Sequence, residues 1–140
     1  MLANRISKDV VLMGFPVAPP GVSIDQNMRL AQEKGKYFSR GGEAFLLSWF
    51  YSQVRNRGPW DFKQRGAQYE DFGNFHYGAV GTAAGISEEM LLRAAGAAQS
   101  RAGTSSSEFG HWWSAPPYGD DPRDQRCIKD GIEYAKSAKV

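Results

Sequence analysis

The sequence predicts a mainly α-helical fold, a compact single domain of four to five helices. Its 140 residues suffice for one domain and are too few for two ordinary ones. Apolar residues recur at three- and four-residue spacing along much of the chain, which is the spacing of one helix face. Glycine, proline and capping residues separate these stretches. The pattern leaves room for one small β-hairpin, either in residues 1–22 or in the connector 57–67.

Residues 1–22 are expected to form an extended N-terminal arm that ends at a Pro-Pro-Gly turn, and residues 23–140 to form the globular domain. The run "VVLMGFPVAPPG" in this arm is about half the length of a membrane span and contains Pro16. The prolines and the lack of a small-residue cleavage site disfavour a signal peptide. We therefore expect no membrane span, and export that depends on a carrier or a fused delivery segment.

The first two helices are predicted from their ends and their apolar content. Residues 23–35 predict one helix, with Ser23 as its N-cap and Gly35 just past its last turn. Residues 43–55, "EAFLLSWFYSQVR", predict the most apolar helix, which the Gly-Pro pair at 58–59 ends.

A third helix is predicted over residues 68–84, with Phe72 and Phe75 on one apolar face. Glycine inside a helix costs about 1 kcal/mol relative to alanine, so glycines gathered on one side indicate the close approach of another backbone or of a ligand. Close helix packing is the commoner cause. The glycines on that side are Gly78, Gly81 and Gly85.

Two more helices are predicted after a turn. Residues 87–103 form one, capped by Ser87 and stopped by Gly103, and residues 120–139 form the last, with Asp121 as N-cap. A loop rich in serine, glycine, proline and aromatic residues joins them. Because Asp121 has the capping role, its neighbour Asp120 is expected to be the freer acid.

Composition narrows the function classes. The net charge is +2, from 17 basic and 15 acidic residues, a small surplus for a strong nucleic-acid binder. The single cysteine, Cys127, excludes an internal disulfide and a Cys-rich zinc site, and inside a helix it is a poor nucleophile. The sequence contains no P-loop, HExxH or GxSxG motif. We expect neither a metal nor a cofactor.

The densest polar stretch is "YEDFGNFHYG", residues 69–78, whose candidate catalytic residues are Glu70, Asp71 and His76. On an unbroken helix, Glu70 and His76 point about 120° apart, so they meet only if Gly73 breaks the helix. The alternative is a helix whose first-turn acids are solvated and whose histidine lies at the edge of the core.

Two further clusters are candidates for substrate binding. The connector "GPWDFKQRG" carries Trp60, Lys63 and Gln64. The stretch "EFGHWWSAPPYGDDPRDQ" carries Asp120 as a candidate acid, and rings that either fold over the core or line a groove: His111, Trp112 and Trp113. Aromatic rings beside paired carboxylates are typical of carbohydrate sites, where the acids serve as general acid and as base or nucleophile. The histidines, lysines and arginines would equally suit a ribonuclease.

Five stretches occur in order: "PPGVSIDQN", "WFYSQVRNRGPWDFKQ", "YEDFGNFHYGAVGTAAG", "LLRAAGAAQ" and "GDDPRDQRCIKDGIEY". Together they resemble the polymorphic toxin type 44 domain, from about Pro19 to Lys136. The resemblance implies a toxin module at the C-terminal end of a bacterial secreted effector. Such a domain is delivered into rival bacteria and is neutralised by a cognate immunity protein.

The resemblance also bears on the site residues. The family's stretch similar to "DFGNFNYGATG" aligns with residues 71–81 and has asparagine where this chain has His76. This difference shifts weight from His76 to Asp71, Asn74 and Tyr77. The "GDDP-DQ" stretch matches without change, which keeps its two adjacent aspartates as candidates.

The leading prediction is an antibacterial effector that hydrolyses the glycan strands of peptidoglycan in the periplasm. Glu70 or Asp71 would be the general acid, Asp120 the second carboxylate, and Lys63 and Gln64 would position the substrate. Its expected partners are an immunity protein, a delivery polypeptide or secretion apparatus, and peptidoglycan.

Two alternatives remain open. One is a metal-independent ribonuclease that uses His76, Lys63 and His111, with a basic face formed by Arg55, Arg57, Lys63 and Arg65. The other is a non-enzymatic module that binds a partner through Trp112 and Trp113.

Overall fold

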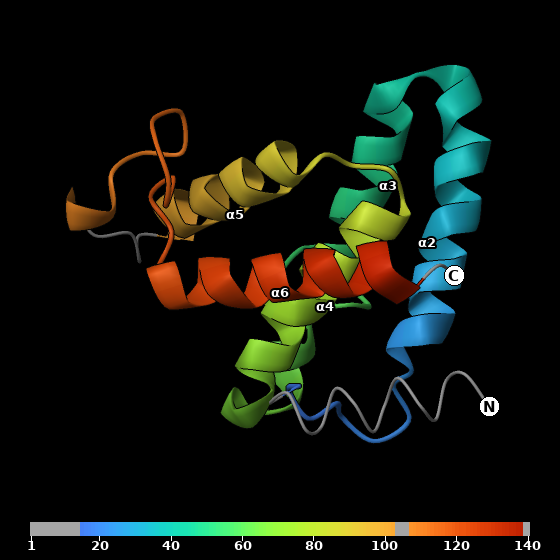
Figure 1. Cartoon of the computed structure of the whole chain (residues 1–140), viewed down its shortest axis with the longest axis horizontal. Helices are drawn as coiled ribbons and strands as arrows, with labels where there is room; N and C mark the ends of the chain where they lie inside the picture. The colour runs from blue at the N-terminus through green and yellow to red at the C-terminus, as the bar shows by residue number, and fades with distance from the viewer. Residues whose placement is uncertain (1–14, 103–106, 139–140) are drawn as a thin grey trace.

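The computed structural model describes residues 15–102 and 107–138. Helices α2 (Ile24–Phe38) and α3 (Glu43–Val54) form a hairpin joined by the 3-10 turn η1 (Ser39–Gly41) (Figure 1). A connector with two 3-10 turns leads to helix α4, and helices α5 and α6 follow. The bounds of these elements are η2 (Phe62–Arg65), η3 (Ala67–Tyr69), α4 (Glu70–Ala83), α5 (Glu88–Ala102), η4 (Ser107–Phe109) and α6 (Pro122–Ala138).

The prediction of a mainly α-helical fold is confirmed. No strand occurs in the described residues, and the connector 57–67 contains 3-10 turns where a β-hairpin was an option. Residues 1–14, the other option, and Gly103, the expected end of α5, lie outside the described residues. The division between arm and domain at residue 22 stays a prediction. Phe15 packs edge-on against Phe75, with ring centroids 4.3 Å apart, so the end of the arm contacts the domain.

The capping residues predicted from the sequence act as caps. The Ser23 hydroxyl accepts a hydrogen bond from Gln26 N at 3.2 Å, and the Ser87 hydroxyl accepts one from Met90 N at 3.2 Å. At the start of α6, Asp121 Oδ1 accepts from Arg123 N at 2.8 Å. Each bond satisfies an N–H that the first turn of a helix leaves unpaired.

The sequence suggested that Gly35 ends the first helix, and this prediction is wrong. Helix α2 continues to Phe38, and Gly35 is buried inside it. A Cβ at this position would overlap the carbonyl group of Ala84. The small residue therefore serves the packing of α2 against the end of α4.

Helix α4 lies at the centre of the fold, and α6 crosses it at close range (Figure 1). A Cβ at Gly78 would overlap the Ile128 carbonyl oxygen, and one at Gly131 would overlap the Phe75 carbonyl oxygen. The two glycines thus let the helix backbones approach from both sides. This confirms the close backbone approach predicted for Gly78, whereas Gly81 faces the Leu91 side chain.

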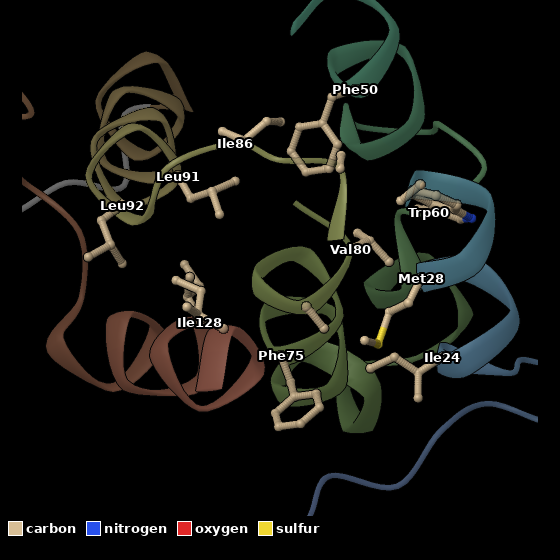
Figure 2. Close-up of a cluster of buried hydrophobic side chains, with 14 of the residues drawn as sticks. Ile24, Met28, Phe50, Trp60, Phe75, Val80, Ile86, Leu91, Leu92 and Ile128 are labelled. Carbon is tan, nitrogen blue, oxygen red and sulfur yellow. The ribbon is translucent and has the colours of Figure 1, made fainter. Parts of the chain in front are cut away.

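Figure 2 shows how the core lies on both sides of α4. Met28 of α2 packs on one side, and Leu91 and Ile128 lie on the side of α5 and α6. Phe72 and Phe75, the predicted apolar face of α4, are both buried. None of the described helices is both long enough and apolar enough to cross a membrane.

Candidate functional site

Two acidic segments that are far apart in the sequence meet where α4 and α6 pack. The first turn of α4 carries Glu70 and Asp71, and the turn that begins α6 follows the loop ending at Gly119. Arg123 Nη2 lies 3.0 Å from Asp71 Oδ2 and joins the two segments. We call this cluster the acidic corner; its carboxylates are Glu70, Asp71, Asp120, Asp121 and Asp124.

Asp120 is buried, with 2% of its surface exposed, and does not have the freedom that the sequence suggested. Its carboxylate accepts hydrogen bonds from Gln125 Nε2 at 2.8 Å and from Asp121 N at 2.9 Å. Burial raises the pKa of Asp120 and outweighs these two bonds, which favour the charged form. Asp120 is thus held in place inside the acidic corner.

Asp124 lies in the first turn of α6, and its pKa is the most strongly shifted among the acids of the corner. It is 9% exposed, and its Oδ2 accepts from Gln99 Nε2 at 3.4 Å. Burial raises its pKa from 3.8 to about 6, and the neighbouring charges add to this, with Asp120 first and Glu70 next. A carboxyl with this pKa keeps its proton to a higher pH than an ordinary acid does.

Asp71 has a different environment. Its side chain is 40% exposed and forms the ion pair with Arg123, whose own side chain is 74% exposed. The hydrogen bond and charge of Asp71 raise the pKa of the Arg123 guanidinium. The acidic corner therefore joins an acid that tends to stay protonated, Asp124, to one that is paired with a cation.

The other polar groups near the corner fit poorly as nucleophiles or metal ligands. Burial raises the pKa of the Cys127 thiol to about 11, with Asp71 and Asp124 as further causes, so little thiolate forms at neutral pH. Among the described residues, no three histidine, cysteine, aspartate or glutamate side chains are grouped so that they could hold a metal ion.

His76 lies inside the core, deeper than the edge position suggested by the sequence. Helix α4 is unbroken at Gly73, so the option in which a break there brings Glu70 to His76 is wrong. The imidazole has no exposed surface and is enclosed by the rings of Trp60, Phe62 and Phe72. Its Nε2 accepts from the Asn27 side-chain amide at 3.0 Å, while Nδ1 has no partner among the described residues. Burial lowers the pKa of His76 to about 3.

Of the expected substrate-binding residues, Trp60 is buried and Tyr77 is partly buried. Trp60 is 8% exposed and packs edge-on against His76 and Trp49. The Tyr77 hydroxyl donates to the Leu91 carbonyl oxygen at 2.7 Å, and burial followed by the charge of Asp120 raises its pKa. Asn74 is partly buried on the same helix. Trp60 and Tyr77 therefore contribute to the packing of the hydrophobic core.

Lys63 and Gln64 are exposed on η2. The Gln64 amide donates to Asp61 Oδ2 at 2.8 Å, and the same oxygen accepts from Arg57 N at 2.8 Å. Asp61 is thus occupied by the turn itself, and Lys63 is not bound to it.

Three rings of the loop before α6 are exposed, those of His111, Trp112 and Trp113. We call residues 109–119 the aromatic loop. His111 and Trp113 stack in parallel, with centroids 4.5 Å apart and an interplanar angle of 1°. Trp112 is 42% exposed and Trp113 61% exposed. The loop is held to α5 by Arg93, which donates to the carbonyl oxygens of Trp112 at 2.9 Å and Ser114 at 3.0 Å.

The model of the bacterial toxin 44 family matches residues 60–137, which is more than half of the chain. The chain belongs to the bacterial toxin 44 family. The matched region contains α4, α5 and all but the last residue of α6, and with them the whole acidic corner and the aromatic loop. No curated protein and no solved structure matches the chain.

For this toxin domain, reasoning from the sequence missed three residues of the acidic corner: Arg123, Asp124 and Gln125. A signal was present in the stretch "GDDPRDQ", because Asp120 and Asp124 stand four residues apart, with Gln125 next. The ion pair of Arg123 with Asp71 joins residues 52 apart, and no local pattern announces it.

Proposed function

We propose that this toxin domain hydrolyses the glycan strands of peptidoglycan and that the acidic corner is its catalytic site. One observation carries the proposal: two carboxyl groups of unlike environment share the corner. Asp124 has a pKa raised to about 6, whereas Asp71 forms an ion pair with Arg123. Acids whose environments separate their pKa values are the usual arrangement for paired acid and base catalysis.

In the proposed reaction, Asp124 donates its proton to the glycosidic oxygen as the bond from this oxygen to the anomeric carbon breaks. Asp71 takes a proton from water, whose oxygen bonds to the anomeric carbon, or attacks that carbon directly before water releases the sugar. Arg123 orients the Asp71 carboxylate. Glu70 and Asp120 act through their charges, which raise the pKa of Asp124. Asp120 is thus a positioning residue in this proposal.

The substrate-binding residues of the proposal are exposed ones. Trp112 and Trp113 offer flat ring faces, and sugars bind to such faces by stacking. His111 lies parallel to Trp113 and extends that surface. Lys63 and Gln64 are exposed and remain candidates for positioning the strand.

The proposed setting follows from the family and the substrate. A bacterial toxin domain acts on a target cell after delivery, and a cognate immunity protein protects the producing cell. Glycan strands are reached from the periplasm, so we propose that this domain acts there. Toxicity in a bacterial host should then require a periplasmic targeting segment on the expressed domain.

The direct test is incubation of the purified protein with isolated sacculi. Release of soluble fragments with new reducing ends is the expected result, because glycan cleavage frees an anomeric carbon. New amino groups without new reducing ends would point to peptide cleavage, and intact sacculi would remove the proposal. Toxicity retained by the double variant Asp71→Asn/Asp124→Asn would favour a non-enzymatic module.

A ribonuclease is the second candidate, favoured by the exposure of the predicted basic residues Arg55, Arg57, Lys63 and Arg65. Because His76 is buried, it is not accessible for the proton transfer that the ribonuclease alternative assigned to it. Degradation of purified transfer or ribosomal RNA without added metal, together with toxicity in the cytoplasm, would support this candidate over the first.

A further inference from the structure

A groove of about 460 Å³ lies between the aromatic loop and the first turns of α6. Its walls are formed largely by proline rings. Gln125, which holds Asp120 through its amide at 2.8 Å, also lines the groove and places it next to the acidic corner. The lining residues are Pro116, Pro117, Pro122, Gln125, Arg126 and Lys129.

Two cations of α6 line this groove, and neither forms a salt bridge with a carboxylate of the described residues. Arg126 and Lys129 are exposed and three residues apart, so they lie on the same side of the helix. Arg123 and Lys136 of the same helix pair with carboxylates at 3.0 Å and 3.6 Å. Within residues 15–102 and 107–138, no such partner exists for Arg126 or Lys129. The groove thus combines apolar walls with two unpaired positive charges.

The lining residues also indicate the chemical class of ligand that the groove would bind. Proline has no backbone N–H to donate, so three proline rings offer chiefly carbon surface. Gln125 is 4% exposed, and its Nε2 is occupied by Asp120 and by the Leu92 carbonyl oxygen at 3.4 Å. A ligand that fits both features has a small apolar part and at least one anionic group, such as a carboxylate.

We propose that this groove binds the carboxylate-bearing peptide stem of the peptidoglycan strand. The inference rests on the proposed function. In it, the acidic corner acts on the glycan and the groove binds the peptide attached to that glycan. The short side chains of the stem would contact Pro116, Pro117 and Pro122, and its carboxylates would bind Arg126 and Lys129. Cleavage would then be selective for strands that still carry their peptides.

The test measures binding by titration calorimetry with two probes: a soluble disaccharide–tetrapeptide, and the same disaccharide with its peptide removed. The wild type should bind the first probe at least tenfold more tightly, and Arg126→Gln/Lys129→Gln should lose most of this difference. Lys36→Gln/Arg40→Gln is the matched control, because it removes two exposed cations four residues apart on α2 and η1. The control should behave as the wild type does, and melting curves verify that both variants fold.

Equal affinity of the wild type for the two probes would overturn the inference, whether or not sacculi are cleaved. A short single-stranded RNA that binds the wild type, and loses affinity in Arg126→Gln/Lys129→Gln, would assign the groove to phosphate and also overturn it. Peptide-dependent binding without any cleavage of sacculi would support the groove and count against the hydrolase alone. The two proposals therefore fail separately.

Discussion

Arg123 of α6 reaches Asp71 of α4, with 3.0 Å between Nη2 and Oδ2, and this ion pair links two helix starts that are 52 residues apart in sequence. The side chains are 74% and 40% exposed, so solvent screens the pair and it adds little to stability. The pair instead fixes the Asp71 carboxylate within the acidic corner, where its charge is one of those that raise the pKa of Asp124 after burial. In the proposed mechanism, the pair therefore matters for the chemistry of the corner.

The first prediction compares the two members of this pair. Asp71→Asn should lower activity roughly 100-fold or more, the usual scale for losing acid–base help, while the free energy of unfolding changes by less than about 1 kcal/mol. Arg123→Gln breaks the same pair but keeps the carboxylate, so it should lower activity less. Sacculus digestion and melting curves of both variants provide the comparison. Equal losses would mean that Asp71 serves only to hold Arg123, and a fully active Asp71→Asn would exclude it from the site.

The second prediction concerns Asp124 as the general acid. Asp124→Asn cannot donate a proton, so activity should fall roughly 100-fold or more. In the wild type, activity should decline as pH rises through about 6, because Asp124 then loses its proton. Initial rates of sacculus digestion between pH 4.5 and 8 measure both effects, with buffers of about equal ionic strength. A rate that climbs steadily across this interval would be incompatible with Asp124 as the acid.

The third prediction uses the opposed titrations of His76 and Asp124. His76 has a folded pKa of about 3, below its unfolded value, so the fold loses stability as pH falls below about 6.5. Asp124 has a folded pKa of about 6, above its unfolded value, so its protonation stabilises the fold as pH falls through 6, and that contribution disappears as pH rises. Between about pH 4 and 6 the two effects oppose each other in the wild type.

Variants separate the two titrations. His76→Leu removes the first and conserves volume, so its stability should rise as pH falls from 7 to 5, by at most about 1 kcal/mol per pH unit. Asp124→Asn removes the second, so its stability should fall over the same interval more steeply than that of the wild type. Denaturant titrations at several pH values measure these slopes. His76→Leu should also remain toxic; loss of toxicity in a stable variant would return His76 to the catalytic site.

The positions of the helices could be predicted because the residues that begin and end helices act through local contacts. Ser23, Ser87 and Asp121 cap helices through bonds to N–H groups two or three residues ahead, and such bonds need no tertiary contact. Gly35 misled the prediction because the same residue type ends helices and fills close contacts. A glycine that faces another backbone cannot be distinguished from a stop signal without knowing what lies opposite.

The site was harder to predict because its properties arise between segments. Periodicity placed His76 near the apolar face of α4, but its burial depends on Trp60 and Phe62 from the preceding connector. The pKa of Asp124 is raised first by burial and by the charge of Asp120, and the charges of Glu70 and Asp71 from α4 add to this. The pattern of α6 alone shows neither the burial nor the charges from α4. The sequence offered Glu70, Asp71 and Asp120 as catalytic carboxylates, but it did not indicate the ion pair of Asp71 with Arg123.

The final prediction concerns the helix crossing that brings the acidic segments together. Gly78→Ala and Gly131→Ala each place a methyl group against a backbone carbonyl, which cannot rotate away as a side chain could. Each change should lower the free energy of unfolding by about 1–3 kcal/mol or more, because α4 and α6 must separate to accept the methyl group. Activity should fall as well, since the separation moves Asp124 relative to Asp71.

Gly73→Ala is the matched control in the same helix as Gly78, because a Cβ at this position meets nothing within 4 Å. It should raise stability by about 0.5–1 kcal/mol through the better helix propensity of alanine and leave activity unchanged. Thermal melts and sacculus digestion of the three variants make the comparison. If Gly78→Ala proved as stable as Gly73→Ala, the close crossing of α4 and α6 would be incorrect, and the acidic corner that depends on it would have to be abandoned.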